Sequence, residues 1–456
     1  MRSVAPHARP LLIALLVACG GDPADNDPTD GVVVLEEQCD GFATEPVDVA
    51  VPAPFVYDVT MSGREGVGDY WSLLDLDDDG VLDLIEHHHG NNADGDAMGE
   101  AWYVWWGEGL GFGARTDYAL PLDHRELDGL YGANFVQAVF DVTGDGVPDL
   151  VMPEDPVTRE VWDAEGDRHW RVFAGEGRSG FATEPIAWSV PAPIDHQVHS
   201  SRTGGMAWTT FDLDGDGVVE LVQTAAPGVP GTLGFEEGTP HWRVYANLGD
   251  GFDDDYEVWP LPPLPDDRDG MFTDHTQALP QRSVRTQDLT GDGLPDLIAT
   301  RATVWPYAIW GGEEDPHWLV YVNEGDGFAD EAIAWSVPSA EDVYPSSGED
   351  WIVEVSRELD TLVIGAGMPN LVRPAAGGWD VYRNRGTGFD DEPTPWAVPD
   401  AVFGALWADG GAVAEGWTTV DLDGDGCLDL VLTAGLDLGV PDAGTTTWTW
   451  RVWPGA

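Results

Sequence analysis

The ten residues DLDGDGVVEL, which run from Asp212 to Leu221, are the most informative stretch of this chain, because close copies recur along its length. The copies are DLDDDGVLDL from Asp75, DVTGDGVPDL from Asp141, DLTGDGLPDL from Asp288 and DLDGDGCLDL from Asp421. Self-similarity at a roughly constant spacing is the signature of a repeat architecture. The sequence therefore predicts one repeated supersecondary unit, and each acidic copy is called an Asp loop below.

A second motif alternates with the Asp loops. It reads HWRVYANLGDGF from His241 and HWLVYVNEGDGF from His317, with related copies from Trp102, His169 and Trp379. Apolar runs enter and leave each Asp loop, and the second motif adds two further strands, so each unit contains four short strands. Units of four strands at this spacing are typical of propeller blades.

One copy of the Asp loop is degenerate. The residues GAGMPNL, which end at Leu371, keep the glycine and apolar positions, but the ligand positions become Leu362, Ile364, Ala366 and Asn370. The chain thus contains six repeats, of which five retain the acids. This predicts an all-β domain over residues 38–456, a six-bladed β-propeller of four-stranded blades.

The chain ends predict that the ring is closed. The C-terminal WRVWPGA from Trp450 matches a third strand and then stops, whereas CDGF from Cys39 matches the turn GDGF from Gly249. The last blade is therefore expected to be completed by the N-terminal strand. The same register brings Cys39 near Cys427 at the start of the neighbouring second strand, which predicts a disulfide in an exported chain. Two unpaired thiols are the alternative.

The Asp loops predict metal sites. The pattern Asp-x-Asp-x-Asp-Gly-x-x-Asp places carboxylates at loop positions 1, 3, 5 and 9, and hard cations such as calcium require six to eight oxygen ligands. We expect about five calcium ions, with the position-7 carbonyl as a further ligand. Thr143 and Thr290 replace a position-3 acid and predict weaker sites. The expected ligands are Asp75, Asp77, Asp79, Asp83; Asp141, Asp145, Asp149; Asp212, Asp214, Asp216, Glu220; Asp288, Asp292, Asp296; and Asp421, Asp423, Asp425, Asp429.

Three alternatives to calcium binding exist for these loops. A single copy could be an Asp/Gly turn that needs no metal, but five copies of closely spaced, unneutralised acids would repel strongly. An EF-hand is excluded because helical periodicity is absent on either side of the loops. Magnesium is disfavoured because it gives up its water reluctantly.

The loops and Gly-Phe motifs together resemble the FG-GAP/VCBS repeats of integrin α-chain propellers and related bacterial surface proteins, from about residue 39 to the end. The resemblance implies a β-propeller whose blades are rigidified by calcium at the acids named above. It also implies a binding or adhesion function. It does not specify the ligand, because such repeats occur in adhesins, lectins and other surface proteins.

The first residues predict export. Arg2 and Arg9 precede a short apolar run, which cannot span a bilayer of about 30 Å. The run ends in LVAC at Cys19, which resembles the lipobox of bacterial lipoproteins and implies a signal peptide over 1–18 and acylation of Cys19. An ordinary signal peptide is the alternative. Residues 19–37 read as an acidic flexible tether, and the resemblance favours the outer membrane or cell surface.

The net charge of -63 excludes nucleic acid as a partner, which leaves an extracellular protein or glycan. The predicted function is a calcium-stabilised, surface-displayed binding or adhesion propeller. A lectin-like carbohydrate binder is one alternative. A hydrolase of surface polysaccharide or phosphoester is the enzymatic alternative, but no catalytic motif is recognised.

Binding is expected on the long connections at the end of the ring opposite the Asp loops, because long loops on a rigid scaffold commonly carry function. These connections carry the ligand-face candidates His87, His88, His89, His199 and His275. The three consecutive histidines also fit a transition-metal site or a solvated loop. The recurring tryptophans fit packing between blades or, alternatively, platforms that stack on sugars.

Overall fold

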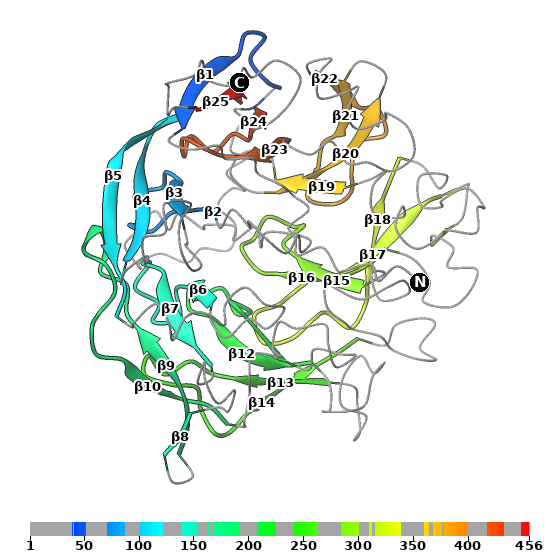
Figure 1. Ribbon diagram of the computed structural model, residues 1–456. Helices are drawn as coiled ribbons and strands as arrows, with labels where there is room; N and C mark the ends of the chain where they lie inside the picture. Colours follow the sequence, from blue (N-terminus) through cyan, green and yellow to red (C-terminus); the bar gives the residue numbers. More distant parts are fainter. Residues whose placement is uncertain are drawn as a thin grey trace, which may run out of the picture.

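A computed structural model describes residues 39, 41–51, 71–86, 101–121, 138–153, 162–164, 167–191, 208–224, 241–262, 284–300, 310–311, 315–338, 360–363, 368–375, 378–398, 417–432 and 448–455. Six antiparallel sheets are arranged in a ring (Figure 1), which confirms the predicted six-bladed β-propeller. Among these residues, the single helical element is a short 3-10 turn, η1 (Gly177–Ser179), and none of their helical segments is long and apolar enough to cross a membrane.

Each blade follows the same strand order, from the strand before the Asp loop to the strand after the Gly-Phe turn. The first blade contains β2 (Trp71–Leu74), β3 (Asp83–Glu86), β4 (Ala101–Glu108) and β5 (Gly111–Ala119). The second contains β6 (Ala138–Phe140), β7 (Asp149–Met152), β9 (Asp167–Phe173) and β10 (Ile186–Ser189), with β8 (Trp162–Ala164) added beside β9. The third contains β11 (Trp208–Phe211), β12 (Glu220–Gln223), β13 (His241–Tyr245) and β14 (Glu257–Pro260).

The remaining blades repeat this pattern. The fourth contains β15 (Val284–Gln287), β16 (Asp296–Ala299), β17 (His317–Tyr321) and β18 (Ile333–Ser336). The fifth contains β19 (Asp360–Val363), β20 (Pro369–Ala375), β21 (Gly378–Tyr382) and β22 (Thr394–Ala397). The sixth contains β23 (Trp417–Val420), β24 (Asp429–Leu432), β25 (Trp448–Trp453) and β1 (Val47–Val51).

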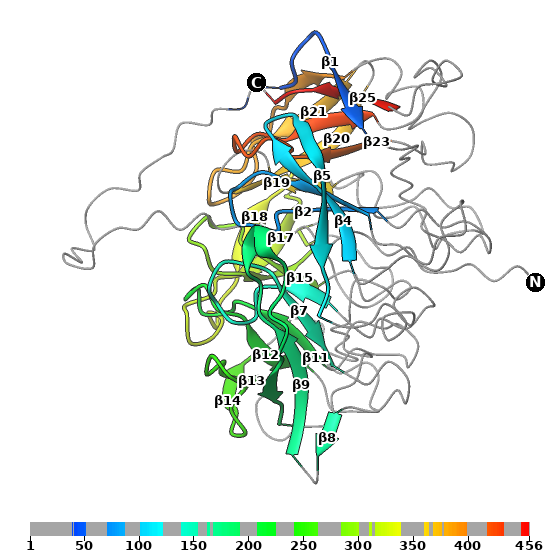
Figure 2. The same ribbon diagram turned by 60° about the vertical axis from the view of Figure 1, so that its left-hand side comes forward.

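The sixth blade closes the ring with both ends of the chain. Strand β1 pairs antiparallel with β25, from Val47 opposite Val452 to Val51 opposite Trp448, and the two strands lie side by side in Figures 1 and 2. The pairing continues into the turn, where the Ala43 N–H donates to the Pro454 carbonyl at 2.7 Å. The predicted closure by the N-terminal strand is therefore confirmed.

The hydrophobic core is divided among six seams, one between each pair of neighbouring blades. The seam between the third and fourth blades joins Leu213, Val222, Trp242 and Trp259 to Leu297, Tyr321 and Phe328. The other five clusters combine neighbouring blades in the same way, including the sixth with the first. Because both faces of a blade are covered, β12 and β16 are buried along their whole length.

The phenylalanine of each Gly-Phe turn packs on aromatic side chains of the preceding blade. The Phe252 ring lies 5.5 Å from the Trp170 ring and 5.9 Å from the Trp188 ring, both edge-on. Phe181, Phe328 and Phe389 make equivalent contacts. These tryptophans are at most 5% exposed, so packing between blades is confirmed and they cannot serve as sugar-stacking platforms.

In the third, fourth and fifth blades, an asparagine side chain forms hydrogen bonds to the preceding blade. The amide nitrogen of Asn323 donates to the Leu213 carbonyl of the third blade at 2.7 Å and to the Pro295 carbonyl of its own blade at 3.3 Å. Asn247 and Asn384 make the same pair of bonds. The equivalent positions in the other three blades are Gly107, Gly175 and Gly455. A Cβ added to any of them would lie 2.6 Å or less from an atom of the residues just before the second strand of the same blade.

Asn323→Ala is expected to lower the free energy of unfolding by about 2 kcal/mol. It removes the two hydrogen bonds of the amide nitrogen between blades and the bond that its oxygen accepts from the Gly325 N–H. Urea denaturation measures the effect. Glu324→Ala, one residue along in the same turn and exposed, is the matched control and should change stability little. Equal effects of the two substitutions would contradict the proposed role of the amide.

Candidate metal centres

The first acid of each Asp loop organises the turn around its own carboxylate. Asp212 accepts hydrogen bonds from the backbone N–H groups of Gly215 at 2.7 Å and Gly217 at 3.0 Å. The two glycines have φ values of 80° and 86°, a left-handed conformation that glycine adopts without strain. Asp141, Asp288 and Asp421 are held in the same way, so the local sequence closes each of these loops around its first acid.

The acid at position 9 has a structural role that the sequence did not reveal. Asp83 is fully buried and accepts from the backbone N–H of Leu76 at 2.9 Å and of Gly107 at 2.8 Å. It therefore joins its own loop to the third strand of the blade. Asp149, Asp296 and Asp429 make the same two bonds.

The degenerate loop supports this structural role. Asn370 is buried and its Oδ1 accepts from the Asn384 N–H at 2.7 Å. An uncharged amide has thus replaced the acid at the one loop that lacks the other ligands, and it preserves the bond to the third strand. A polar residue kept at this position, Asn370, was the signal in the sequence that position 9 serves the fold.

The structure also corrects the alignment of the degenerate copy. Asn370 pairs with Leu362 across β19 and β20, whereas Asp296 pairs with Gln287, the residue before the first acid of its loop. Leu362 is therefore equivalent to Gln287, the residue before the first acid, and not to Asp288. The connection between the paired residues is one residue shorter here than in the fourth blade.

Three of the five acidic loops bring their carboxylates together. In each group the ligand atoms lie within 4.8 Å of one another. The groups are Asp75, Asp77 and Asp83; Asp212, Asp214 and Glu220; and Asp421, Asp423 and Asp425. The two loops that carry Thr143 and Thr290 at position 3 form no such group among the described residues, and each threonine hydroxyl lies 3.4 Å from the first acid of its loop.

Two of the converging groups contain a carboxylate oxygen without a partner. Asp77 Oδ1 and Asp423 Oδ1, both at loop position 3, are buried and have no hydrogen-bond partner. The Asp77 side chain is only 8% exposed. A buried oxygen that accepts nothing costs free energy, and a cation bound by the group would supply the missing interaction.

Burial raises the pKa of the acids in these loops. At position 9 it raises the pKa of Asp83 and Asp429 to about 7, of Asp296 to about 6 and of Glu220 to about 8, against the opposing effect of the backbone N–H donors. Burial also raises the pKa of the position-1 acids Asp75, Asp212, Asp288 and Asp421. Each loop thus holds several carboxylates close together, and some of them are partly shielded from solvent. Oxygen-only groups of this kind fit a hard divalent cation of the size of calcium.

Two residues near the first loop were missed by sequence reasoning, Arg178 and Asp78. Asp78 has a φ of 57°, a left-handed conformation, where the other acidic loops have glycine. A Cβ on Gly146 of the second loop would lie 2.7 Å from Asp78 Oδ2. Burial, followed by the charges of Asp141 and Asp145, raises the pKa of Asp78.

Asp78→Gly is expected to raise the free energy of unfolding by about 1 kcal/mol in the presence of chelator. The substitution removes left-handed strain and a carboxylate that repels the second loop. Thermal unfolding in EGTA measures the change. Asp250→Gly, an exposed acid in a turn, is the control, and a destabilised Asp78→Gly variant would contradict the expectation.

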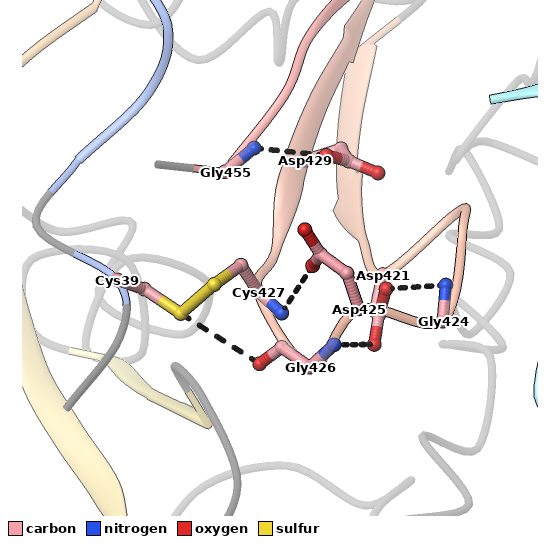
Figure 3. Close-up of a disulfide and its surroundings, with 8 residues drawn as sticks. All are labelled: Cys39, Asp421, Gly424, Asp425, Gly426, Cys427, Asp429 and Gly455. Atoms are coloured by element: carbon pink, nitrogen blue, oxygen red, sulfur yellow. Dashed lines mark hydrogen bonds between the residues drawn. A yellow bond between two sulfur atoms is a disulfide. The ribbon is translucent and has the colours of Figure 1, made fainter. Parts of the chain in front are cut away.

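A disulfide lies beside the sixth loop (Figure 3). Cys39 and Cys427, the pair expected from the strand register, are bonded, with their Cα atoms 5.7 Å apart. The Cys427 N–H donates to Asp425 Oδ1 at 2.8 Å, and both cysteines are buried in the seam between the fifth and sixth blades. The bond thus attaches the N-terminal segment to an acidic loop.

Several predicted residues lie outside the described part of the chain. These are Cys19, the segments 1–18 and 19–37, and the ligand-face candidates His87, His88, His89, His199 and His275.

No protein-family model and no curated protein matches the chain. Among solved structures, it is similar to the Tc holotoxin pore of Photorhabdus luminescens, at 15% identity and a TM-score of 0.46 over 91% of this chain and 15% of that chain. It is also similar to an Agrocybe aegerita lectin that recognises non-reducing terminal N-acetylglucosamine, at 16% identity and a TM-score of 0.42 over 86% of this chain and 84% of that one.

A Bacillus licheniformis rhamnogalacturonan lyase is a further similar structure, at 13% identity and a TM-score of 0.30 over 90% of this chain and 76% of that chain. The chain thus spans a small part of the toxin component and most of the lectin and the lyase. None of these similarities assigns a function.

Proposed function

We propose that this protein is a calcium-stabilised, surface-displayed propeller that binds an extracellular protein or glycan. The observation that carries the calcium assignment is the buried, unpartnered Oδ1 of Asp77, which lies within a group of three converging carboxylates. The matching oxygen of Asp423 in the sixth loop repeats it. The resemblance of the loops to FG-GAP/VCBS repeats supports the same ion.

Calcium has a structural role in this proposal. Each of the three groups contains carboxylates that converge within 4.8 Å of one another, and their charges repel one another in the absence of a cation. A bound divalent ion would neutralise them and fix each strand-to-strand connection. The groups that would hold it are Asp212, Asp214 and Glu220 in the third loop, Asp75, Asp77 and Asp83 in the first, and Asp421, Asp423 and Asp425 in the sixth.

Calcium titration by calorimetry, with native mass spectrometry to count ions, tests the assignment. We expect about five ions, with weaker binding at the two loops that carry threonine. Asp292→Ala should remove one ion, whereas Ala366→Gly in the degenerate loop should leave the count unchanged. A stoichiometry of one or none would refute the proposal.

The ligand is assigned to the long connections opposite the Asp loops. A glycan array probed with the purified protein, with and without EGTA, separates a carbohydrate binder from a protein binder. Replacing His87, His88 and His89 with alanine should abolish binding while the thermal midpoint stays unchanged. Binding lost instead in a folded Asp145→Ala variant, which alters an exposed acid of the second loop, would contradict this choice of face. Hydrolysis of a bound glycan would favour the enzymatic alternative.

The proposal places the protein on the bacterial cell envelope through a lipid on Cys19. Growth with an alkyne-labelled fatty acid should label the wild-type protein. Cys19→Ser should remain unlabelled and lose its membrane association. An unlabelled wild-type protein would indicate an ordinary signal peptide.

A further inference from the structure

The first Asp loop already has a cation against it, and the cation comes from the next blade. Arg178, in η1, donates from Nε to Asp77 Oδ2 and from Nη2 to Asp79 Oδ2, the latter at 2.9 Å. Its guanidinium also lies 5.0 Å from the centre of the Trp106 ring. One side chain of the second blade thus engages the position-3 and position-5 acids of the first.

The local sequence explains this reach. The turn from Gly175 to Phe181 has one residue more than the turn from Asn247 to Phe252, and the extra residue is accommodated as the 3-10 turn. Gly177 has a φ of 55°, and a Cβ placed on it would lie 3.7 Å from the Cβ of Asp77. The turn therefore lies directly on the first loop and presents Arg178 to its acids.

The sixth loop is the natural comparison, because it has the same four acids at positions 1, 3, 5 and 9. Where the second blade has Arg178, the turn of the first blade has Leu110, which packs against the cluster that contains Leu422 of the sixth loop. Among the described residues, no arginine forms an ion pair with Asp421, Asp423 or Asp425. The first loop also carries Asp78 where the sixth has Gly424, but Arg178 is the positive charge that distinguishes the surroundings of the two loops.

We propose that Arg178 is a built-in counter-cation of the first loop, with which calcium must compete. The inference rests on the proposed calcium function and specifies how that function is regulated at one loop. Arg178 occupies one oxygen of Asp77, so an ion bound at the free Oδ1 of the same carboxylate would lie close to a positive guanidinium, and like charges at such a separation repel. Arg178 thereby offsets part of the negative charge of the first loop without calcium, and we expect this loop to fill after the sixth.

The test uses calcium titration of the purified chain by calorimetry and native mass spectrometry. Arg178→Ala should tighten calcium binding at one site about fivefold to tenfold. The gain should disappear in Arg178→Ala combined with Asp77→Asn, and persist in Arg178→Ala combined with Asp423→Asn. Arg385→Ala is the matched control, because Arg385 is equally exposed at 55% but pairs with Asp390 outside the loops. It should leave every calcium affinity unchanged.

Thermal unfolding provides a second readout. In EGTA, Arg178→Ala should melt below the wild type, because Asp77 and Asp79 lose their counter-charge, and saturating calcium should close the difference. If the wild type binds calcium but Arg178→Ala tightens no site, the inference is wrong and the proposed function stands. If no variant binds calcium and the melting difference is the same in EGTA and in calcium, both are wrong.

Discussion

Removal of calcium with EGTA is expected to lower the thermal midpoint of this protein by about 15 °C or more. A ligand that binds only the folded state stabilises it by mass action, by about 2.7 kcal/mol for a site at one hundred times its dissociation constant. Five such sites would together contribute about 13 kcal/mol. For a chain of this size, each kcal/mol corresponds to a shift of about 1 to 2 °C, by extrapolation from smaller domains.

The expected effect is large because the position-9 acids, and the first acid of the first loop, are buried. Asp75 and Asp83 of the first loop and Asp429 of the sixth are at most 3% exposed. Without a cation Asp75 and Asp83 are buried close to one another, and Asp429 lies close to Asp421 and Asp423. Part of the cost can be avoided by protonation, since burial raises the pKa of Asp83 and Asp429 to about 7. Calcium loss should therefore loosen the connections between strands and, through them, the seams.

Differential scanning calorimetry in calcium and in EGTA measures the shift. Re-addition of calcium should restore the midpoint, whereas an equal concentration of magnesium should restore it only in part, because magnesium retains its water. A shift below about 3 °C would mean that the loops contribute little as metal sites, even if ions bind weakly to them.

The parts of the structure that could be predicted from sequence are those that every repeat encodes by itself. The spacing of the Asp loops and Gly-Phe turns gave the four-stranded blade, and the split motif at Trp450 and Cys39 gave the closure. Both follow from local register, because strand pairing within a blade joins segments adjacent in the repeat. The aromatic motif likewise indicated that Trp170 and its equivalents pack between blades.

The parts that could not be predicted depend on neighbouring blades or on a small change of loop length. Arg178 is about one hundred residues from the acids that it contacts, and its position depends on one extra residue in a turn. Asp78 belongs to the first loop, but its carboxylate lies close to Gly146 of the second loop, a contact between blades that local sequence does not indicate. The one-residue deletion in the degenerate loop could not be seen in the sequence. GAGMPNL aligns with GDGLPDL of the fourth blade without a gap, so the deletion lies before this segment.

The disulfide is expected to contribute about 4 to 5 kcal/mol to the stability of the closed ring. Cys39 and Cys427 are separated by 388 residues, and the chain-entropy relation for a loop of that length gives about 6 kcal/mol, which native-state strain and residual structure in the unfolded chain reduce. The bond acts where the ring has no peptide link, because β1 is otherwise held to β25 by non-covalent contacts: strand pairing, the burial of Val49 and Val51, and an ion pair between Asp48 and Arg451.

Replacing both cysteines with serine should therefore lower the free energy of unfolding by that amount, measured by urea denaturation in saturating calcium. Amide hydrogen exchange should accelerate first at Val49 and Val51, because β1 separates from β25 before the other seams open. Reduction of the wild-type protein with a phosphine should reproduce both changes, and the same treatment should leave the double-serine variant unaffected. A loss below about 1 kcal/mol, or exchange that accelerates equally in all six blades, would show that strand pairing and the seams close the ring without the covalent bond.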